Sequence, residues 1–230
     1  MLDAALRSLL ERTPVAALST ALRARGLPST IIDGVHPLVP GTTMVGTART
    51  LRFIPVREDL LAAHGGGHNA QKQVFDTVEP GEVIVIEARG DRTAGTLGDI
   101  LALRALVRGA AGVVTDGAVR DAAAVAAVGL PVFAAGTHPA VLGRRHVPWE
   151  SGVTIACGGA AVQPGDVIVG DGDGLVVIPA AVAADVARAA ADQEQRDAWI
   201  AARIAEGHPV AGLFPLSGDW QRRFDEEAQR

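Results

Sequence analysis

The feature that most constrains this chain is a short alternation of helical and β-type patterns between residues 98 and 136. The spacing of apolar residues predicts a helix over 98–109, a strand in "AGVVTD", a helix over 121–128 and a strand in "LPVFAAG". Only a few residues separate these segments. Strands joined through a helix in this way lie parallel in one sheet, with the helix packed on a face. We therefore expect an α/β fold with a partly parallel sheet.

Hairpin-like strands accompany this alternation. Two segments, "EPGEVIVIEARGD" from Glu79 and "QPGDVIVGDGDG" from Gln163, share a Pro-Gly-acid turn followed by a β-rich run. The run "DGDG", residues 171–174, begins like a calcium-binding loop, but the twelfth position holds Val182 instead of the required Glu. We expect a hairpin turn there. The mixture of hairpins and crossovers predicts a layered α/β sandwich rather than a doubly wound sheet.

The chain is expected to form one domain with two terminal arms. Its parts are an N-terminal helical arm over 1–28, a core over 29–179, and an Ala-rich helix with a further arm over 180–230. The last arm holds three of the eight aromatic residues, Phe214, Trp220 and Phe224. Because aromatic side chains gathered in a terminal segment favour docking, we expect this arm to pack on the core or on a neighbouring subunit.

Composition narrows the classes of function. No window holds the roughly 18 uninterrupted apolar residues of a membrane span, and "MLDAALRSLLERTP" lacks the apolar centre of a signal peptide, so we expect a cytoplasmic protein. A net charge of −5 without a basic block argues against nucleic acid as a partner.

The single cysteine, Cys157, excludes an internal disulfide and is expected to be buried and inert. A Schiff-base mechanism could use only Lys72, the one lysine, which we expect on a solvated helix face.

The stretch "VVTDGAVRDAAAV" carries the first candidate site residues. We expect a strand to end at Val114, Asp116 and Gly117 to turn the chain, and a helix to begin near Arg120. Ligands of α/β folds bind at the carboxyl ends of parallel strands. Arg120 offers a guanidinium fork that matches a carboxylate, and Asp121 offers a hard oxygen to Mg²⁺ or Mn²⁺. The pair could hold an α-keto acid from two sides; alternatively, it is a solvated turn-and-cap pair.

A second candidate is "TLGDIL". Gly98 and Asp99 stand at another predicted helix start, where the backbone amides from Gly98 through Ile100 to Leu101 could bind an anionic oxygen. Asp99 could orient metal-bound water. The alternative is an ordinary acidic residue in the first helical turn.

The histidines of "AAHGGGHNAQ" do not form a convincing metal pair. His64 and His68 have the i, i+4 spacing of helical ligands, but the three glycines between them oppose a helix. We expect a loop near the site, in which His68 could contact substrate.

The run "TLGDILALRALVRGAAGVVTDGAVRDAAAVAAVGLPVFAAG", followed by "PGDVIVGDGDGLVVIP", resembles the RraA-like family, which includes 4-hydroxy-4-methyl-2-oxoglutarate aldolases and the regulator of RNase E activity. The resemblance covers roughly residues 29–179. It implies a three-layer ββα sandwich, similar to swivelling domains, that assembles as a homotrimer or a dimer of trimers with active sites between subunits.

The resemblance also implies residue roles. In the family's aldolases, the residue matching Asp121 binds the divalent metal, the one matching Arg120 holds pyruvate, and the loop matching Gly98 to Leu101 supplies amides and a water-linked carboxylate, here Asp99. A Glu from the C-terminal helix of a neighbouring subunit approaches the metal-bound waters, and Glu194 is the candidate.

Two functions from different classes follow. The first is a Mg²⁺- or Mn²⁺-dependent aldolase or decarboxylase that releases pyruvate from a short 4-hydroxy-2-oxo acid or from oxaloacetate through a metal-stabilised enolate. The second is a non-catalytic regulator that binds a ribonuclease E-type partner. A pure binding module has no need for Asp99, Arg120 and Asp121 together, so the intact set favours the enzyme.

Overall fold

The computed structural model describes residues 2–228. The α-helices are α1 (Ala4–Arg12), α2 (Val15–Ala24), α3 (Glu58–His64), α4 (Ala70–Thr77), α5 (Asp99–Val107), α6 (Ala122–Val128), α7 (Ala183–Ala205) and α8 (Gly218–Ala228), and two 3-10 turns are η1 (Leu142–Arg144) and η2 (Ala180–Val182). The strands are β1 (His36–Pro37), β2 (Met44–Pro55), β3 (Glu82–Glu87), β4 (Gly112–Val119), β5 (Val132–Thr137), β6 (His146–Ser151), β7 (Ile155–Cys157), β8 (Ala160–Val162), β9 (Val167–Asp171) and β10 (Gly174–Ile178).

The main sheet is mixed and strongly curved. Its order is β1-β5-β4-β3-β2-β9-β10, with β6 also paired to β2. The central run from β2 through β3 and β4 to β5 is parallel, and the remaining pairs are antiparallel. A bridge between Ile31 and Val176 brings the far edge back toward the segment that leads into β1, so the sheet nearly closes. The predicted crossovers and the 171–174 hairpin are confirmed.

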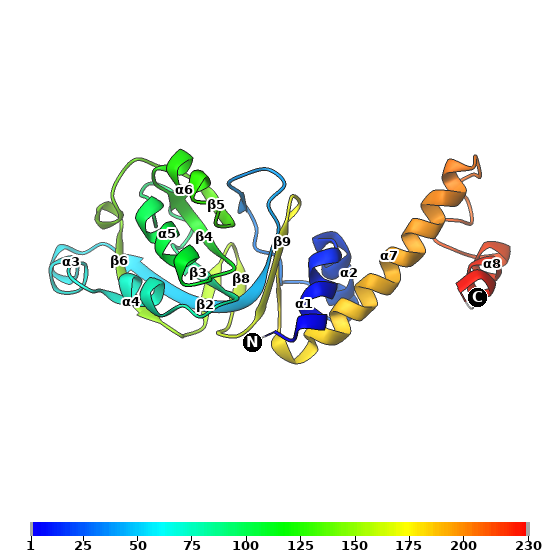
Figure 1. Cartoon of the computed structure of the whole chain (residues 1–230), viewed down its shortest axis with the longest axis horizontal. Coiled ribbons are helices and arrows are strands. Elements are labelled where there is room, and N and C mark those ends of the chain that lie inside the picture. The colour runs from blue at the N-terminus through cyan, green and yellow to red at the C-terminus, as the bar shows by residue number, and fades with distance from the viewer. Residues whose placement is uncertain (1, 229–230) are drawn as a thin grey trace.

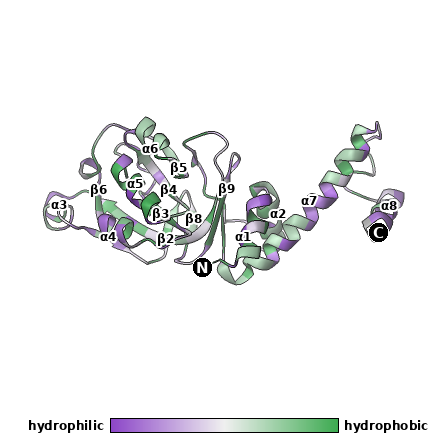
Figure 2. Ribbon diagram, in the orientation of Figure 1, coloured by the Kyte–Doolittle hydropathy of each residue, from purple (hydrophilic) through white to green (hydrophobic). Residues whose placement is uncertain are grey.

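Three apolar clusters define the layers. The helices α4, α5 and α6 cover one face of the central strands (Figure 1), around buried residues such as Phe75, Ala102 and Val125. The opposite face packs against β9, β10 and the small β7–β8 sheet, around Phe133 and Ile168. The apolar strands between these layers stand out in Figure 2. The expected ββα sandwich is thus confirmed, and α1, α2 and α7 cover the outer side of β9 and β10.

The strand β4 runs further than the sequence indicates. Asp116 and Gly117 were expected to turn the chain, but β4 continues through them to Val119, with all eight of its residues buried. Asp116 Oδ1 accepts the backbone N–H of Ala88 at 2.6 Å, and Oδ2 accepts that of Gly90 at 2.9 Å. These bonds satisfy the buried carboxylate, although burial still raises its pKa. The strand therefore delivers Arg120 and Asp121 directly at its carboxyl end.

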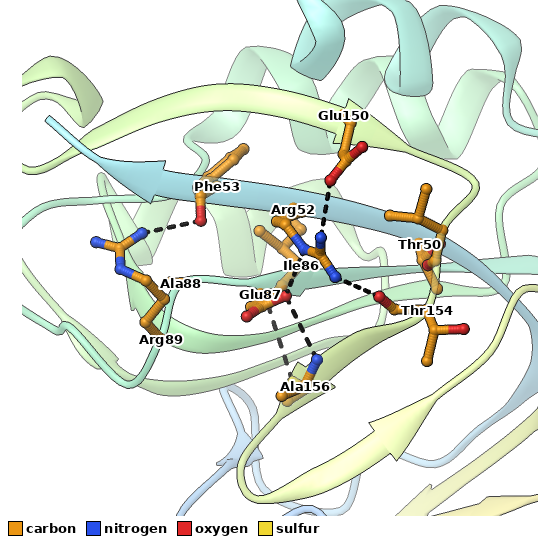
Figure 3. A network of polar contacts seen from close by, with 12 residues as sticks. Thr50, Arg52, Phe53, Ile86, Glu87, Ala88, Arg89, Glu150, Thr154 and Ala156 are labelled. Atoms are coloured by element: carbon orange, nitrogen blue, oxygen red, sulfur yellow. Dashed lines mark hydrogen bonds and ion pairs between the residues drawn. The ribbon is translucent and has the colours of Figure 1, made fainter. Parts of the chain in front are cut away.

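A polar network ties β6 and the small sheet to the central strands (Figure 3). Arg52 on β2 contacts Glu87 of β3 at 3.1 Å and Glu150 of β6 at 2.8 Å, and it donates to the carbonyl of Thr154 just before β7. Glu87 also accepts the N–H of Ala156 at 3.4 Å. One guanidinium therefore joins β2, β3 and the segment from Glu150 to Thr154, which are distant in sequence.

The C-terminal arm projects from the core (Figure 1). The helix α7 packs on α1 and α2 through its first half. Near its far end, Trp199 meets Trp220 and Phe224 of α8, with ring centroids 6.2 Å and 5.5 Å apart. Within one chain, therefore, α8 docks on α7 and not on the core, and Phe214 remains 63% exposed.

Candidate active site

A cleft of about 290 Å³ opens at the carboxyl end of β4. Its walls include both predicted motifs, which supply Gly98, Asp99, Ile100, Leu101, Arg120 and Asp121. The two segments, residues 98–101 and 120–121, are separate in the chain. Parallel pairing of β3, β4 and β5 brings the loop before α5 next to the end of β4. A parallel bridge between Gly95 and Ala118 continues this alignment.

The backbone of Asp121 adopts an uncommon conformation. Its φ and ψ are 56° and 43°, in the left-handed region, which costs a residue other than glycine on the order of 1 kcal/mol. Asp121 occupies the N-cap position of α6, and its carbonyl accepts the N–H of Val125 at 2.9 Å. Its side chain, however, makes no capping hydrogen bond. Asp121 therefore stands at the cap position, as the turn-and-cap alternative expects, but its carboxylate takes no part in the cap.

The Asp121 carboxylate instead faces the start of α5. A Cβ placed on Gly98 would lie 3.4 Å from Asp121 Oδ2. Three residues earlier in the loop, a Cβ on Gly95 would lie 2.6 Å from the Cβ of Arg120, closer than real Cβ atoms approach. The N–H of Arg120 donates to the carbonyl of Leu97 at 2.9 Å. Glycine at these two positions lets the loop lie directly against the Arg-Asp pair.

Arg120 and Asp121 also contact each other. Arg120 Nε lies 3.4 Å from Asp121 Oδ2, and the two side chains are 44% and 47% exposed. An ion pair this exposed contributes little to stability, about 0–1 kcal/mol. The contact uses Nε, which leaves the two terminal guanidinium nitrogens for an anionic ligand.

The start of α5 supplies backbone donors to the same cleft. Gly98 is the N-cap and offers no side chain to the first turn, so the amides that follow it have no helical partner. Asp99 lies in this first turn. Ile100 also lines the cleft and is 78% exposed. The structure thus places the N-terminal end of a helix, which favours anions, beside the paired carboxylate and guanidinium of Asp121 and Arg120.

Sequence analysis missed Gln71. This side chain on α4 is buried, lines the cleft, and donates through Nε2 to the carbonyl of Thr96 in the loop before α5. The sequence does hold a signal for this residue, because Gln71 shares a helix face with Val74 and Phe75, which are both buried. A polar residue on an apolar face requires a partner, and here that partner is the site loop.

Glu194 does not reach this cleft within the chain. It lies on α7, which packs on α1 and α2, across the sheet from α5 and α6. Only a second copy of the chain could bring Glu194 to the site.

The other sequence candidates lie outside the cleft. His68 Nε2 contacts Asp76 Oδ2 at 2.8 Å, and the His64 ring packs edge-on against Trp149 with centroids 5.0 Å apart. Lys72 is exposed, as predicted, and donates to the carbonyl of Gly67. Cys157 is buried, as predicted, and burial raises the pKa of its thiol. Burial therefore makes this thiol a poor nucleophile.

The donors of the cleft fit a hard divalent cation that keeps most of its water. Among residues 2–228, no group of three or more His, Cys, Asp or Glu side chains is arranged to enclose a metal. Asp121 supplies one carboxylate group, and its side chain is 47% exposed. Asp99 lines the same cleft. Mg²⁺ is commonly bound by one or two carboxylates, with water and substrate oxygens completing the shell.

The chain matches a known family model and curated relatives. The family model described as RraA-like, Aldolase/RraA, matches residues 15–177. The chain is 36% identical over 195 residues to the "Putative 4-hydroxy-4-methyl-2-oxoglutarate aldolase" of Halalkalibacterium halodurans, covering 83% of this chain and 86% of the relative.

Solved structures show the same fold. Streptomyces coelicolor RraAS2, described as an unusual member of the RNase ES inhibitor RraA protein family, superposes with a TM-score of 0.79 at 35% identity, covering 86% of this chain and 96% of that one. A Pseudomonas syringae protein superposes with a TM-score of 0.83 at 30% identity, covering 94% of this chain and 95% of that one.

In the described part of the chain, no helix has the length and apolar character to cross a membrane.

Proposed function

This chain belongs to the RraA-like family, and from that premise we propose that it is a divalent-metal-dependent carbon–carbon lyase that releases pyruvate from a short 4-hydroxy-2-oxo acid. The observation that carries the proposal is the left-handed backbone of Asp121, which directs a carboxylate away from its own helix and toward the start of α5. Strain of this kind at a ligand cleft is typical of functional residues. The relatives named as 4-hydroxy-4-methyl-2-oxoglutarate aldolases support the same class of reaction.

Different cleft residues would bind the substrate carboxylate, the metal and a water. Arg120 would hold the carboxylate of the oxo acid with its guanidinium fork, and the amides after Gly98 would donate to its oxygens. Asp121 would hold Mg²⁺ or Mn²⁺, which when bound offsets the negative charge that develops on the 2-oxo oxygen. Asp99 would orient a water that carries the proton.

The reaction then balances without any other cofactor. Removal of the proton from the 4-hydroxyl group turns that oxygen into a carbonyl as the C3–C4 bond breaks. The electron pair of the broken bond passes to C3, and protonation there gives pyruvate. Oxaloacetate decarboxylation uses the same electron sink, with carbon dioxide leaving instead of a carbonyl compound, so we extend the proposal to that activity.

We further propose that the site is completed by a second copy of the chain, in a homotrimer or a dimer of trimers. The outer face of α5 leaves Ile100, Leu103 and Val107 exposed by 78%, 52% and 69%, which is a patch that favours burial. The helix α7 projects from the core and would be able to reach another chain (Figure 1), and Glu194 lies at its middle. The assembly would act in the cytoplasm.

An assay of pyruvate release tests this function. Purified protein is incubated with 4-hydroxy-4-methyl-2-oxoglutarate and with oxaloacetate, each with Mg²⁺, with Mn²⁺ and with chelator. Because oxaloacetate also loses carbon dioxide without protein, and faster with divalent metals, release is measured above a protein-free control with the same metal. We expect an excess of pyruvate only with metal, and we expect Asp121→Ala to abolish that excess. Metal-independent release, or release by chelated Asp121→Ala protein, contradicts the mechanism.

A second candidate is a regulator of a ribonuclease E-type enzyme, which the 35% identity to RraAS2 supports. It predicts tight binding to such a ribonuclease and no pyruvate from either substrate. The enzyme is favoured because a binding surface does not require a strained carboxylate inside a cleft.

A further inference from the structure

Gln71 lines the cleft from α4, of which it is the second residue. The residue is only 6% exposed. Its amide Nε2 donates to the carbonyl of Thr96, and because a carbonyl oxygen can only accept, this bond fixes which end of the amide faces the loop before α5. A buried amide donor without a partner is unfavourable, so the bond ties α4 to that loop.

Most of the other hydrogen bonds to this loop come from β4. Thr96 donates through its backbone N–H and its hydroxyl to the carbonyl of Ala118, at 2.7 Å and 2.9 Å. The carbonyl of Leu97 accepts the N–H of Arg120 at 2.9 Å. The strand therefore holds the loop at two successive residues, and Gln71 adds the bond from the helix.

Two consecutive peptide groups lead into the first turn of α5. The Thr96 carbonyl and the Leu97 N–H belong to the first group, and the second group ends with the Gly98 N–H. Because a peptide group is planar, a bond to its carbonyl also fixes the direction of its N–H. Gln71 therefore fixes the first group and Arg120 fixes the second, just before the amides that the first turn of α5 offers to an anion.

We propose that Gln71 is a positioning residue for the oxo-acid site, where it holds the loop so that the backbone amides at the start of α5 face the ligand carboxylate. The inference rests on the proposed function, because it takes that carboxylate to bind at the start of α5. Donors that are already in place when a ligand arrives bind it more tightly than donors that must first be ordered.

Loss of the Gln71 bond should therefore weaken binding of the oxo acid more than binding of the metal. The peptide group after Thr96 would be free to turn, and the amides that follow it would be held less firmly. Asp121, which would hold the metal, is positioned by β4 and α6 instead. We expect metal affinity to change little.

Three variants test this role. Gln71→Met keeps the approximate length of the side chain and removes the donor. Gln71→Glu restores a donor only when its carboxyl group is protonated, and burial raises the pKa of a carboxyl group. Gln73→Met is the matched control, because Gln73 lies on the same helix and donates to the carbonyl of His68 at 3.0 Å, outside the cleft.

Calorimetry measures the affinity for Mg²⁺ alone, and then for pyruvate with saturating Mg²⁺, each relative to wild type at the same pH. For Gln71→Met we expect pyruvate affinity to fall about tenfold at every pH, with Mg²⁺ affinity within about twofold of wild type. For Gln71→Glu we expect at least this loss at about pH 8 and recovery of most of the affinity at about pH 5. Gln73→Met should bind both ligands like wild type.

Each outcome decides for or against the role of Gln71. Wild-type pyruvate affinity in Gln71→Met overturns it, because a loss confined to Gln71→Glu at high pH is then charge repulsion. Failure of Gln71→Glu to recover at low pH also overturns it, and this variant alone decides if Gln71→Met does not fold. Metal-dependent pyruvate release by the wild-type protein leaves the proposed function intact in these cases. Wild-type protein that neither releases nor binds pyruvate rejects both proposals.

Discussion

The carboxylate of Asp121 lies so close to Gly98 that a Cβ on the glycine would be 3.4 Å from Oδ2. This contact joins the end of β4 to the start of α5, and it gives a direct test of the site. Gly98 has a φ of −132°, which any residue adopts, so Gly98→Ala should fold normally. Its methyl group would occupy space beside the carboxylate, and we expect Mg²⁺ affinity and kcat/KM to fall about tenfold, measured by calorimetry and by pyruvate release.

A neighbouring glycine supplies the contrasting variant. In Gly95→Ala the new methyl group would lie 2.6 Å from the Cβ of Arg120, so the backbone must move. We expect a loss of about 1–3 kcal/mol in the free energy of unfolding, as is usual for overpacking. Equal stability of the two variants in urea would show that the loop can shift, and it would contradict the close approach described above.

Asp121→Gly should separate stability from activity. Glycine adopts the left-handed conformation freely, so the change should raise the free energy of unfolding by about 1 kcal/mol, whereas Asp121→Asn should leave it within about 0.5 kcal/mol. Both variants remove the carboxylate, and both should lose pyruvate release at least about a hundredfold. Urea unfolding and the release assay measure the two effects. An Asn variant that retained activity would show that the carboxylate is not the metal ligand.

Much of this site was accessible from the sequence because its two motifs lie in a regular alternation. The short connections between 98 and 136 fix parallel pairing, and parallel pairing brings the strand and helix ends to one edge. The Asp116–Gly117 turn was predicted wrongly, since Asp-Gly favours turns locally. The amides of Ala88 and Gly90, supplied by a distant loop, hold that carboxylate in an extended strand.

Three features of the structure could not be predicted, because the sequence around them carries no signal or only a weak one. The left-handed backbone of Asp121 is encoded by no local pattern in the sequence. Gln71 is one polar residue on an apolar helix face, and its partner at Thr96 is known only from the fold. The place of Glu194 depends on contacts between chains.

The Arg52 network predicts a stability difference between two arginines. Arg52→Ala would leave Glu87, whose side chain is only 16% exposed, without its ion-pair partner, and we expect a loss of about 1–3 kcal/mol in the free energy of unfolding. Arg57→Ala is the matched control, because its pair with Asp59 is well exposed and should contribute much less to stability than the Arg52 network. Arg52→Lys should not rescue, since an ammonium cannot reproduce the fork that contacts three partners. Thermal and urea unfolding of the three variants test this order.

The stability of the fold should fall in mild acid because of His146. This side chain is fully buried, and burial, reinforced by the nearby Arg89, lowers its pKa to about 4 from an ordinary value of 6.5. Between these values the unfolded chain binds a proton that the folded chain does not, so stability present above pH 6.5 is lost as the pH falls toward 4, by up to about 3 kcal/mol. The buried Asp116, whose pKa is raised, has the opposite effect on stability near the acid end of this range.

The variant His146→Phe has no imidazole to protonate, so its free energy of unfolding should depend less on pH over this range. Loss of the Arg89 contact, 3.3 Å from Nδ1, should lower its stability at pH 7. Urea unfolding from pH 7 to pH 4 compares the two proteins, and equal slopes would mean that other groups set the acid sensitivity.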